Sequence, residues 1–220
     1  RRANGIEITV RYDGASETIA GSHLLVAAGR RPNSDGLNLE AAGVAVDARG
    51  TITVDDHLQT NVPGVWALGD VNGRGAFTHT SYNDFEIVLD NLDGRTRALS
   101  NRIPTYAVYI DPPLGRAGMT EAEVRRSGRE ALVGKRLMTR VGRAVEKGET
   151  QGFMKVVVDA ETREILGAAI LGVGGDEVVH CIVDVMTAGL PYTAISRTMH
   201  IHPTVSELVP TMLQELRPLE

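Results

Sequence analysis

A histidine and a glutamate near the C-terminus have the spacing of a proton-transfer pair. The segment reads His202-Pro203-Thr-Val-Ser-Glu207. Proline is favoured at the first position of a helix because its missing N–H has no intrahelical partner there, so the sequence predicts a helix over residues 203–216. Glu207 on the following turn can orient the imidazole and stabilise its protonated form. The alternative is a capped surface helix with an incidental histidine.

A carboxylate that directly follows a glycine marks a second candidate site. Residues 60–70 read TNVPGVWALGD, in which a Pro-Gly turn leads into an apolar strand over residues 65–68. Gly69 lets a ligand approach the backbone closely. Asp70 would lie at the C-terminal edge of a sheet, where open α/β folds bind cofactors and hydrogen-bond sugar hydroxyls. An isolated Gly-Asp pair is more often a plain loop, but the Thr, Gly and apolar positions around it favour a cofactor site.

Composition and charge exclude several classes of partner. The 220 residues are 42% hydrophobic and 23% charged, as in a soluble globular protein. The net charge of −5 is spread without a basic run, which argues against nucleic-acid and anionic-membrane partners. No stretch approaches the roughly 20 apolar residues of a membrane helix, and the N-terminus has no signal-peptide apolar region. We therefore expect a cytoplasmic protein. The start on Arg-Arg, without Met, indicates a fragment.

The single cysteine and the other histidines predict neither a redox centre nor a metal site. Cys181 is the only cysteine, so these residues hold no intrachain disulfide and no dithiol. It lies in an apolar helical run, where a free cysteine usually behaves as a small buried hydrophobe. Its neighbour His180 would face another direction on a helix. His200 and His202 lack a third ligand nearby, so no metal is expected.

The first hundred residues have an α/β pattern. Residues 6–12 alternate apolar and polar side chains, a turn follows at Asp13-Gly14, and residues 23–28 form a short apolar run. This pattern predicts a strand, a turn and a buried strand. Further on, the sequence predicts short helical turns over 37–42, strands over 51–54 and 65–68, and a helix over 79–92.

The rest of the chain has strands first and helices afterwards, which favours an α+β domain over residues 101–220. Thr120 and Glu123 have the spacing of a capping box, which predicts the start of a short helix there. The predicted strands cover residues 106–110, 133–141, 153–159 and 164–171, and the predicted helices cover 174–188 and 203–216. A domain boundary is expected near residues 97–103.

Segments along nearly the whole chain resemble the C-terminal half of the pyridine nucleotide-disulfide oxidoreductases, the family of dihydrolipoamide dehydrogenase, glutathione reductase and mercuric reductase. LLVAAGRRPN at 24–33 resembles the strand and turn that leave the nicotinamide-nucleotide domain, and TNVPGVWALGD at 60–70 resembles the second FAD motif. YIDPPLGRAGMTEAEV at 109–124 resembles the start of the dimerisation domain, and HPTVSE at 202–207 resembles its catalytic end. The segments occur in the order that the family has.

The resemblance implies a domain organisation and an activity. Residues 1–33 would end the NAD(P) domain, 34–100 would be the second FAD segment, and 101–220 would be the dimerisation domain. This is an α/β remnant of the FAD/NAD(P)-binding domains followed by an α+β domain with an antiparallel sheet. The parent protein would be a homodimer that transfers electrons from NAD(P)H through FAD to a disulfide or another small-molecule acceptor.

The resemblance also implies roles for single residues around the flavin. Asp70, next to Gly69, would hydrogen-bond the FAD ribityl chain. Thr78 and His79 would begin a helix whose N–H groups point at the flavin pyrimidine; a helix N-terminus stabilises the negative charge of a reduced flavin. The alternative for Thr78 is a simple N-cap. Gly29 would let the chain pass close to the nicotinamide.

In the family, His202 and Glu207 would act across the dimer, on the dithiol beside the partner's flavin. Tyr109 would flank the nicotinamide pocket. There is no GxGxxG loop, because GVGGDE at 172–177 is only superficially similar to one. The phosphate loops and the cysteine pair would lie upstream, so the chain alone is expected to be inactive. The competing hypothesis is a dimerisation module without redox activity of its own.

Overall fold

The chain divides after Arg95 into two units, residues 1–95 and 96–220, in a computed structural model that describes residues 5–220. Among residues 5–220, none of the helices combines the length and the apolar composition that crossing a membrane requires.

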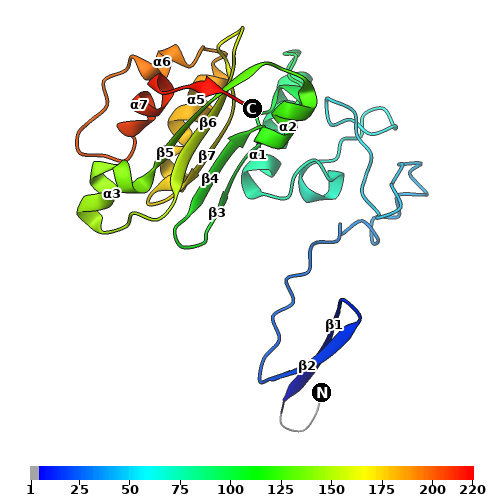
Figure 1. Cartoon of the computed structure of the whole chain (residues 1–220). Coiled ribbons are helices and arrows are strands. Elements are labelled where there is room, and N and C mark those ends of the chain that lie inside the picture. The colour runs from blue at the N-terminus through cyan, green and yellow to red at the C-terminus, as the bar shows by residue number, and fades with distance from the viewer. Residues whose placement is uncertain (1–4) are drawn as a thin grey trace. The chain divides into compact units, whose positions relative to one another are not determined.

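The first unit opens with a β-hairpin of β1 (Ile6–Tyr12) and β2 (Ala15–Gly21), drawn in blue in Figure 1. Asp13 and Gly14 form its turn with φ of 45° and 77°, as a type I′ hairpin turn requires. The prediction of the first strand and the turn is confirmed. The prediction of a second strand over residues 23–28 is wrong, because the second strand is β2. The tight turn pairs Tyr12 with Ala15, so the polar run that follows the turn becomes the partner strand. Leu25 and Val26 are instead 88% and 76% exposed.

The rest of the first unit is a long loop that ends in a helix. The loop leads into a 3-10 helix, η1 (Gly69–Asn72), and then into α1 (Thr78–Leu92), which confirms the predicted helix. The strands predicted over 51–54 and 65–68 are reduced to isolated bridges, Val46 with Ile52 and Gln59 with Trp66. In a continuous strand the backbone groups of successive residues are hydrogen-bonded to a neighbouring strand. The described loop provides such a backbone partner only at the two bridges. The helical turns predicted over 37–42 are turns only.

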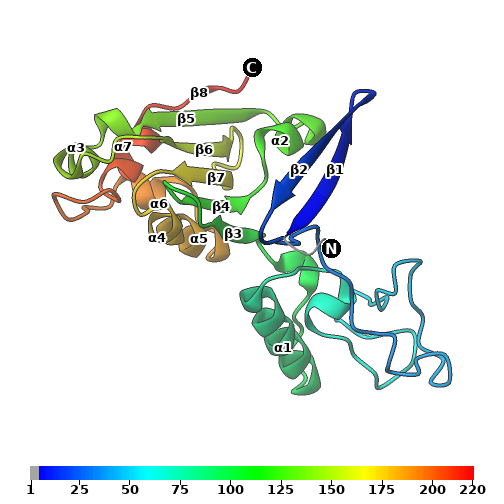
Figure 2. The same cartoon turned by 90° about the horizontal axis from the view of Figure 1, so that it is seen from below.

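The second unit is built on an antiparallel sheet of six strands in the order β3-β4-β7-β6-β5-β8, which can be followed in Figure 2. This confirms the predicted α+β class. Two of the strands, β4 and β8, were not predicted. The strands are β3 (Thr105–Val108), β4 (Leu114–Gly118), β5 (Ala131–Leu137), β6 (Phe153–Asp159), β7 (Ile165–Leu171) and β8 (Arg217–Pro218).

The helices of the second unit cover the two faces of this sheet unequally. The main core joins Met154, Val156 and Ile170 of the sheet to Ile182 and Met212 of the later helices. Successive side chains of a strand point to opposite faces, so Val157 lies on the other face, where it packs with Val124 of α2. The helices are α2 (Glu121–Ser127), α3 (Gly142–Lys147), α4 (Gly175–Val178), α5 (His180–Thr187), α6 (Thr193–Ser196) and α7 (Leu208–Gln214), with 3-10 turns η2 (Leu99–Asn101) and η3 (Met138–Arg140).

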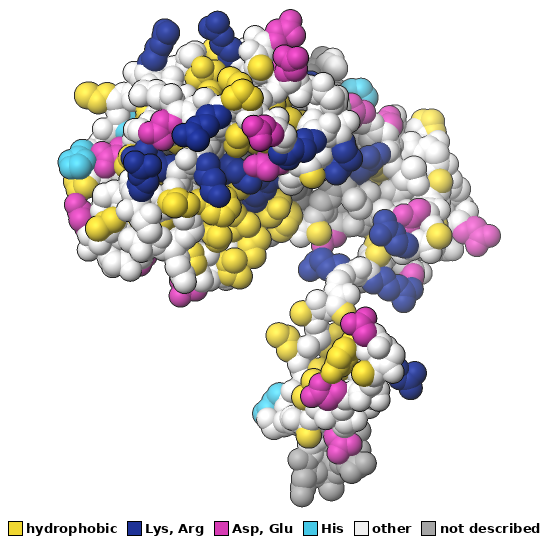
Figure 3. All heavy atoms as spheres, viewed as in Figure 1, with side chains coloured by type: hydrophobic (Ala, Val, Ile, Leu, Met, Phe, Trp, Pro, Cys, Tyr) yellow, Lys and Arg dark blue, Asp and Glu magenta, His cyan; other side chains and the backbone are white. Residues whose placement is uncertain are grey.

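The face that carries α2 is the more polar one. Lys135 and Lys155 place their Nζ atoms 5.0 Å and 5.6 Å from the centroid of the Phe153 ring. Lys155 also pairs with Glu121 of α2 at 2.8 Å. Figure 3 shows Lys and Arg side chains in a row across the second unit, above a group of hydrophobic side chains. The main core of the unit lies under the other face, which the remaining helices cover.

The local predictions for this unit had different outcomes. The Thr120–Glu123 capping box is confirmed: Glu123 N donates to Thr120 Oγ1 at 3.2 Å and Thr120 N donates to the Glu123 carboxylate at 2.7 Å. The strand predicted over 133–141 ends at Leu137, where η3 takes over. The helix predicted over 174–188 is divided into α4 and α5 at Val179.

The turn between β6 and β7 contains a carboxylate, Asp159, whose contribution to stability should depend on pH. The Asp159 carboxylate accepts from Thr162 N at 2.9 Å and Glu161 N at 3.0 Å and pairs with Arg129 at 3.3 Å. The Thr162 hydrogen bond above all, then that of Glu161 and the Arg129 charge, hold the pKa of Asp159 below its usual range. A depressed folded pKa contributes stability above the unfolded pKa of about 3.9, and this stability is lost as the pH falls through the folded pKa.

We therefore expect Asp159→Ala to lower the free energy of unfolding by about 1 kcal/mol at pH 7 and by less at pH 3, which lies below the unfolded pKa of about 3.9. Urea unfolding at the two pH values measures this difference. Glu161→Ala is the matched control, because it leaves both backbone donors in place. An equal loss at both pH values would contradict the role of the ionised carboxylate.

Candidate functional site

The Asp70 carboxylate lies on η1 and is paired with an arginine from a distant segment. Arg30 Nε donates to Asp70 Oδ2 at 2.6 Å, and the Asp70 side chain is 36% exposed. Asp70 therefore lies in a 3-10 turn that follows an isolated bridge, which corrects its predicted place at the edge of a sheet. Sequence reasoning missed Arg30, although it directly follows Gly29 in the segment that carried the family resemblance.

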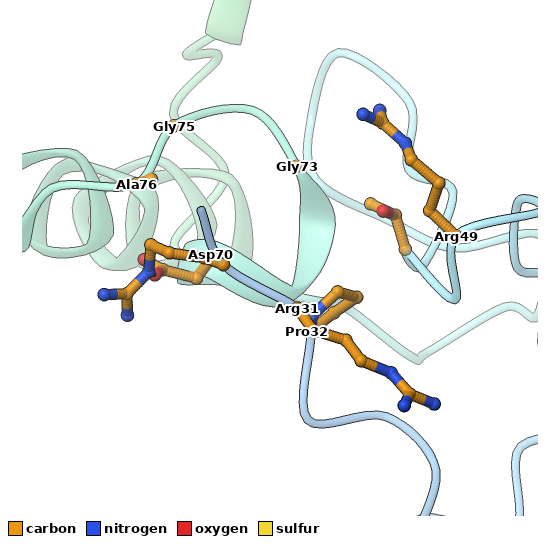
Figure 4. Close-up of a pocket in the computed structure, with 9 residues that line it drawn as sticks. Arg31, Pro32, Arg49, Asp70, Gly73, Gly75 and Ala76 are labelled. Carbon is orange, nitrogen blue, oxygen red and sulfur yellow. The ribbon is translucent and has the colours of Figure 1, made fainter. Parts of the chain in front are cut away.

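Two adjoining hollows meet at this ion pair. One, of about 500 Å³, is drawn in Figure 4, where the labelled Arg31 and Arg49 side chains extend in different directions. The other, of about 570 Å³, reaches the beginning of α1. Both hollows are lined by Arg30, Asp70 and Ala76; the first is also lined by Arg31, Pro32, Arg49, Thr51, Gly73 and Gly75, and the second by Phe77, Thr78, Ser81, Tyr82 and Phe85. The three arginines that line the first hollow, Arg30, Arg31 and Arg49, suit anionic groups of a ligand.

The beginning of α1 is where the sequence placed it. Thr78 is the first residue of the helix and Phe77 is its N-cap, so the alternative of a Thr78 N-cap is wrong. The first turn carries no acidic side chain, and the positive end of the helix dipole is thus available to an anionic group. The His79 ring stacks on the Phe77 ring, with centroids 5.1 Å apart and an interplanar angle of 12°.

Two features of the structure require glycine at position 69. Its φ is 75°, in the left-handed region, and a Cβ there would lie 2.8 Å from Ser81 Oγ of α1. The group that lies close to the Gly69 backbone is therefore a side chain of α1. Close approach of a ligand to Gly69 stays a prediction. Gly29 also has a positive φ, 109°, with no atom within 4 Å of an added Cβ. Tyr109, in the second unit, is 85% exposed.

His202 and Glu207, both in the second unit, are brought together as predicted. His202 Nδ1 lies 2.9 Å from Oε2 and 3.1 Å from Oε1 of Glu207. An ionised carboxylate can only accept, so Nδ1 carries the hydrogen and Nε2 keeps its lone pair for an incoming proton. The His202 side chain is 79% exposed and that of Glu207 only 16%. A fixed carboxylate thus orients an accessible imidazole, which is the arrangement of a general base with its orienting acid.

The segment that holds this pair is a turn, which corrects the predicted helix start at Pro203. The His202–Pro203 peptide bond is cis, and α7 begins only at Leu208, with Glu207 as its N-cap. Thr204 Oγ1 donates to Ile201 O at 2.6 Å and accepts from Glu207 N at 3.2 Å. The second of these bonds is the one that an N-cap side chain makes to the backbone three residues on, so the turn that Thr204 begins leads directly into α7.

His200 supports the same turn from the other side. Its Nδ1 lies 2.9 Å from the carbonyl oxygen of Ser206, so this nitrogen donates. His200 and His202 are therefore each bound through Nδ1 to a different partner.

Cys181 lies away from this chemistry, in α5. Its Sγ donates to Val178 O at 3.2 Å, and the side chain packs against the main core. Burial, followed by the nearby Asp184 charge, raises the pKa of the thiol to about 11. A thiol with such a pKa stays protonated at neutral pH and is a poor nucleophile.

Comparison with known families agrees with this division of the chain. Residues 104–213 match the family described as "Pyridine nucleotide-disulphide oxidoreductase, dimerisation domain". Residues 2–84 match the family described as "Pyridine nucleotide-disulphide oxidoreductase". The two matches fall on the two units.

Known proteins show the same similarity. The chain is 39% identical over 186 residues to the "Probable pyridine nucleotide-disulfide oxidoreductase RclA" of Escherichia coli, covering 84% of this chain and 42% of that protein. It is 35% identical over 205 residues to a dihydrolipoyl dehydrogenase of Cupriavidus necator, covering 92% and 43%. A solved structure, "HOCl-induced flavoprotein disulfide reductase RclA from Escherichia coli", is 36% identical, with a TM-score of 0.86 over 97% of this chain and 49% of that one. The chain thus spans less than half the length of these relatives, and it belongs to the pyridine nucleotide-disulphide oxidoreductase family.

Proposed function

We propose that the full-length protein is a homodimeric flavin-dependent oxidoreductase that moves electrons from NAD(P)H through FAD to a disulfide or similar small-molecule acceptor in the cytoplasm. The observation that carries this proposal is the pairing of His202 Nδ1 with both oxygens of Glu207. Family membership supports the flavin chemistry, and the match of residues 104–213 to a dimerisation domain supports the homodimer.

The residues of the first unit fit FAD by their chemistry. Asp70 would accept hydrogen bonds from ribityl hydroxyls, and the arginines of the adjoining hollow suit the negative pyrophosphate. The beginning of α1, without an acidic residue in its first turn, suits the pyrimidine end, which is anionic when the flavin is reduced. When bound, FAD would accept hydride from the nicotinamide and pass the electrons on.

His202 would handle the proton at the acceptor. Its Nε2 would accept the proton of a thiol and return it later in the cycle, while Glu207 stabilises the charged ring between the two steps. The ring is 79% exposed on its own unit, which supports the proposal that it serves the flavin site of the partner subunit.

The experiment that tests this function measures flavin content and electron transfer in the full-length protein. We expect the purified protein to have a flavin absorption spectrum that NAD(P)H bleaches anaerobically and that lipoamide or glutathione disulfide restores. A protein that does not bind FAD at micromolar concentration would contradict the proposal. A flavin that is bleached but not restored by any disulfide would reject the proposed acceptor class.

Asp70→Ala should weaken FAD binding by about 10–100-fold, the usual effect of losing hydrogen bonds to a charged group. Titration of the flavin-free protein with FAD, followed by flavin fluorescence, measures the dissociation constant. Asp93→Ala is the matched control, because Asp93 also pairs with an arginine, Arg95, at 3.0 Å and neither residue lines either hollow. Equal FAD affinities for the two variants would remove Asp70 from the site.

A further inference from the structure

A buried carboxylate on α1 connects the helix to the loop that carries Asp70. Asp84 is only 2% exposed. Its Oδ2 accepts from Gly69 N at 2.8 Å and from Asn72 Nδ2 at 2.8 Å. Asp70 lies between these two attachment points. The carboxylate therefore holds η1 on both sides of the predicted ribityl contact, through the backbone of Gly69 and the side chain of Asn72.

Asn72 extends this connection into the rest of the loop. It is 4% exposed, and its Nδ2 also donates to Ala67 O at 3.0 Å. Its Oδ1 accepts from Arg74 N at 2.8 Å. Every polar atom of the Asn72 side chain is thus bonded within residues 67–84. A buried network of this kind is rigid when all its members are bonded.

The fit between loop and helix is also steric. A Cβ on Gly69 would lie 2.8 Å from Ser81 Oγ, and a Cβ on Gly75 would lie 2.8 Å from Thr80 Oγ1. Real Cβ atoms do not approach other atoms so closely, so the loop sits on the first two turns of α1 at a distance that glycine alone permits. The network and the close contact hold the same two segments.

We infer that Asp84 is a positioning residue, which holds Asp70 at a fixed place relative to the beginning of α1 so that both contact one flavin. The inference rests on the proposed function, because it assumes that the ligand is FAD. Residues 73–77 connect η1 to α1 covalently, but the flavin needs the two segments in one arrangement. Asp84 supplies that arrangement without touching the ligand.

A double-mutant cycle separates positioning from simple support of the fold. If Asp84 acts through Asp70, removing Asp84 already forfeits what Asp70 contributes, and the two losses do not add. FAD dissociation constants would be measured for the full-length protein and for Asp84→Ala, Asp70→Ala and the double variant. We expect the dissociation constant to rise by about 10-fold or more in each single variant. The double variant should have a dissociation constant close to that of the single variant that binds FAD more weakly.

Two further variants sharpen the test. Asp84→Asn retains an acceptor oxygen for both donors, so its FAD affinity should stay within about threefold of the original. Asp93→Ala removes an exposed carboxylate from the other end of the same helix and should leave FAD affinity unchanged. If Asp84→Ala does not fold by circular dichroism, Asn72→Ala takes its place in the cycle, because it leaves Asp84 bonded to Gly69.

The outcomes distinguish this inference from the proposed function. Multiplicative losses in the cycle would show that Asp84 acts independently of Asp70 and would overturn the inference, as would an unchanged affinity in Asp84→Ala. Absence of FAD binding by the unmodified protein would instead reject the proposed function. Weakened binding in Asp70→Ala together with an unaffected Asp84→Ala would leave the function standing and reject the positioning role alone.

Discussion

Replacing His202 with alanine in the full-length protein should slow electron transfer from the reduced flavin to a disulfide by about 10²–10⁴-fold, the usual contribution of general acid–base catalysis. Reduction of the flavin by NAD(P)H should be nearly unchanged. The reason is the orientation of the ring: Glu207 binds Nδ1 at 2.9 Å, so Nε2 is the atom that exchanges a proton with the acceptor, and hydride transfer from the nicotinamide does not use it.

Anaerobic stopped-flow absorbance separates the two half-reactions. His180→Ala is the matched control, because it removes an exposed histidine from α5 of the same unit. Glu207→Gln should fall between the original protein and His202→Ala, since the amide keeps an acceptor oxygen but lacks the charge that stabilises the imidazolium. Equal slowing of both half-reactions in His202→Ala would disprove the assigned role.

Replacing Gly115 with alanine should destabilise the second unit by about 3 kcal/mol, at the upper end of the usual effect of overpacking. Gly115 lies in β4 and pairs with Ala107 of β3 and Ile170 of β7. A Cβ there would press against the carbonyl oxygen of Gly175 and lie 2.9 Å from Val179 Cγ1. Because the first contact is with backbone, α4 would have to move off the sheet.

Gly142→Ala gives the opposite sign and serves as the control. Gly142 is the first residue of α3, and no atom lies within 4 Å of an added Cβ. Alanine is the better helix former by about 1 kcal/mol, so this variant should be as stable as the original or slightly more stable. Urea unfolding of both variants measures the difference. A Gly115→Ala protein of unchanged stability would mean that α4 does not pack on β4 as closely as described.

The sequence alone was sufficient where a few neighbouring residues decide the structure. The Asp13-Gly14 turn, the alternation in β1, the Thr120–Glu123 capping box and the helix over α1 all depend on residues within one or two turns of each other. The His202–Glu207 pair belongs with them, because the two residues are five positions apart and a local turn brings them together. These signals, with the family resemblance, were enough to assign the family.

Only the tertiary structure decided what depends on distant partners. The apolar run over 23–28 was predicted as a strand because its residues suit one, but no described strand pairs with it. The helix predicted to start at Pro203 starts only at Leu208, after a turn that the Thr204 hydrogen bonds hold. Arg30 lies 40 positions from Asp70, and Asp84 lies 15 positions from Gly69. Residue spacing does not encode contacts over such separations, because packing of the whole unit determines which of many possible partners meet.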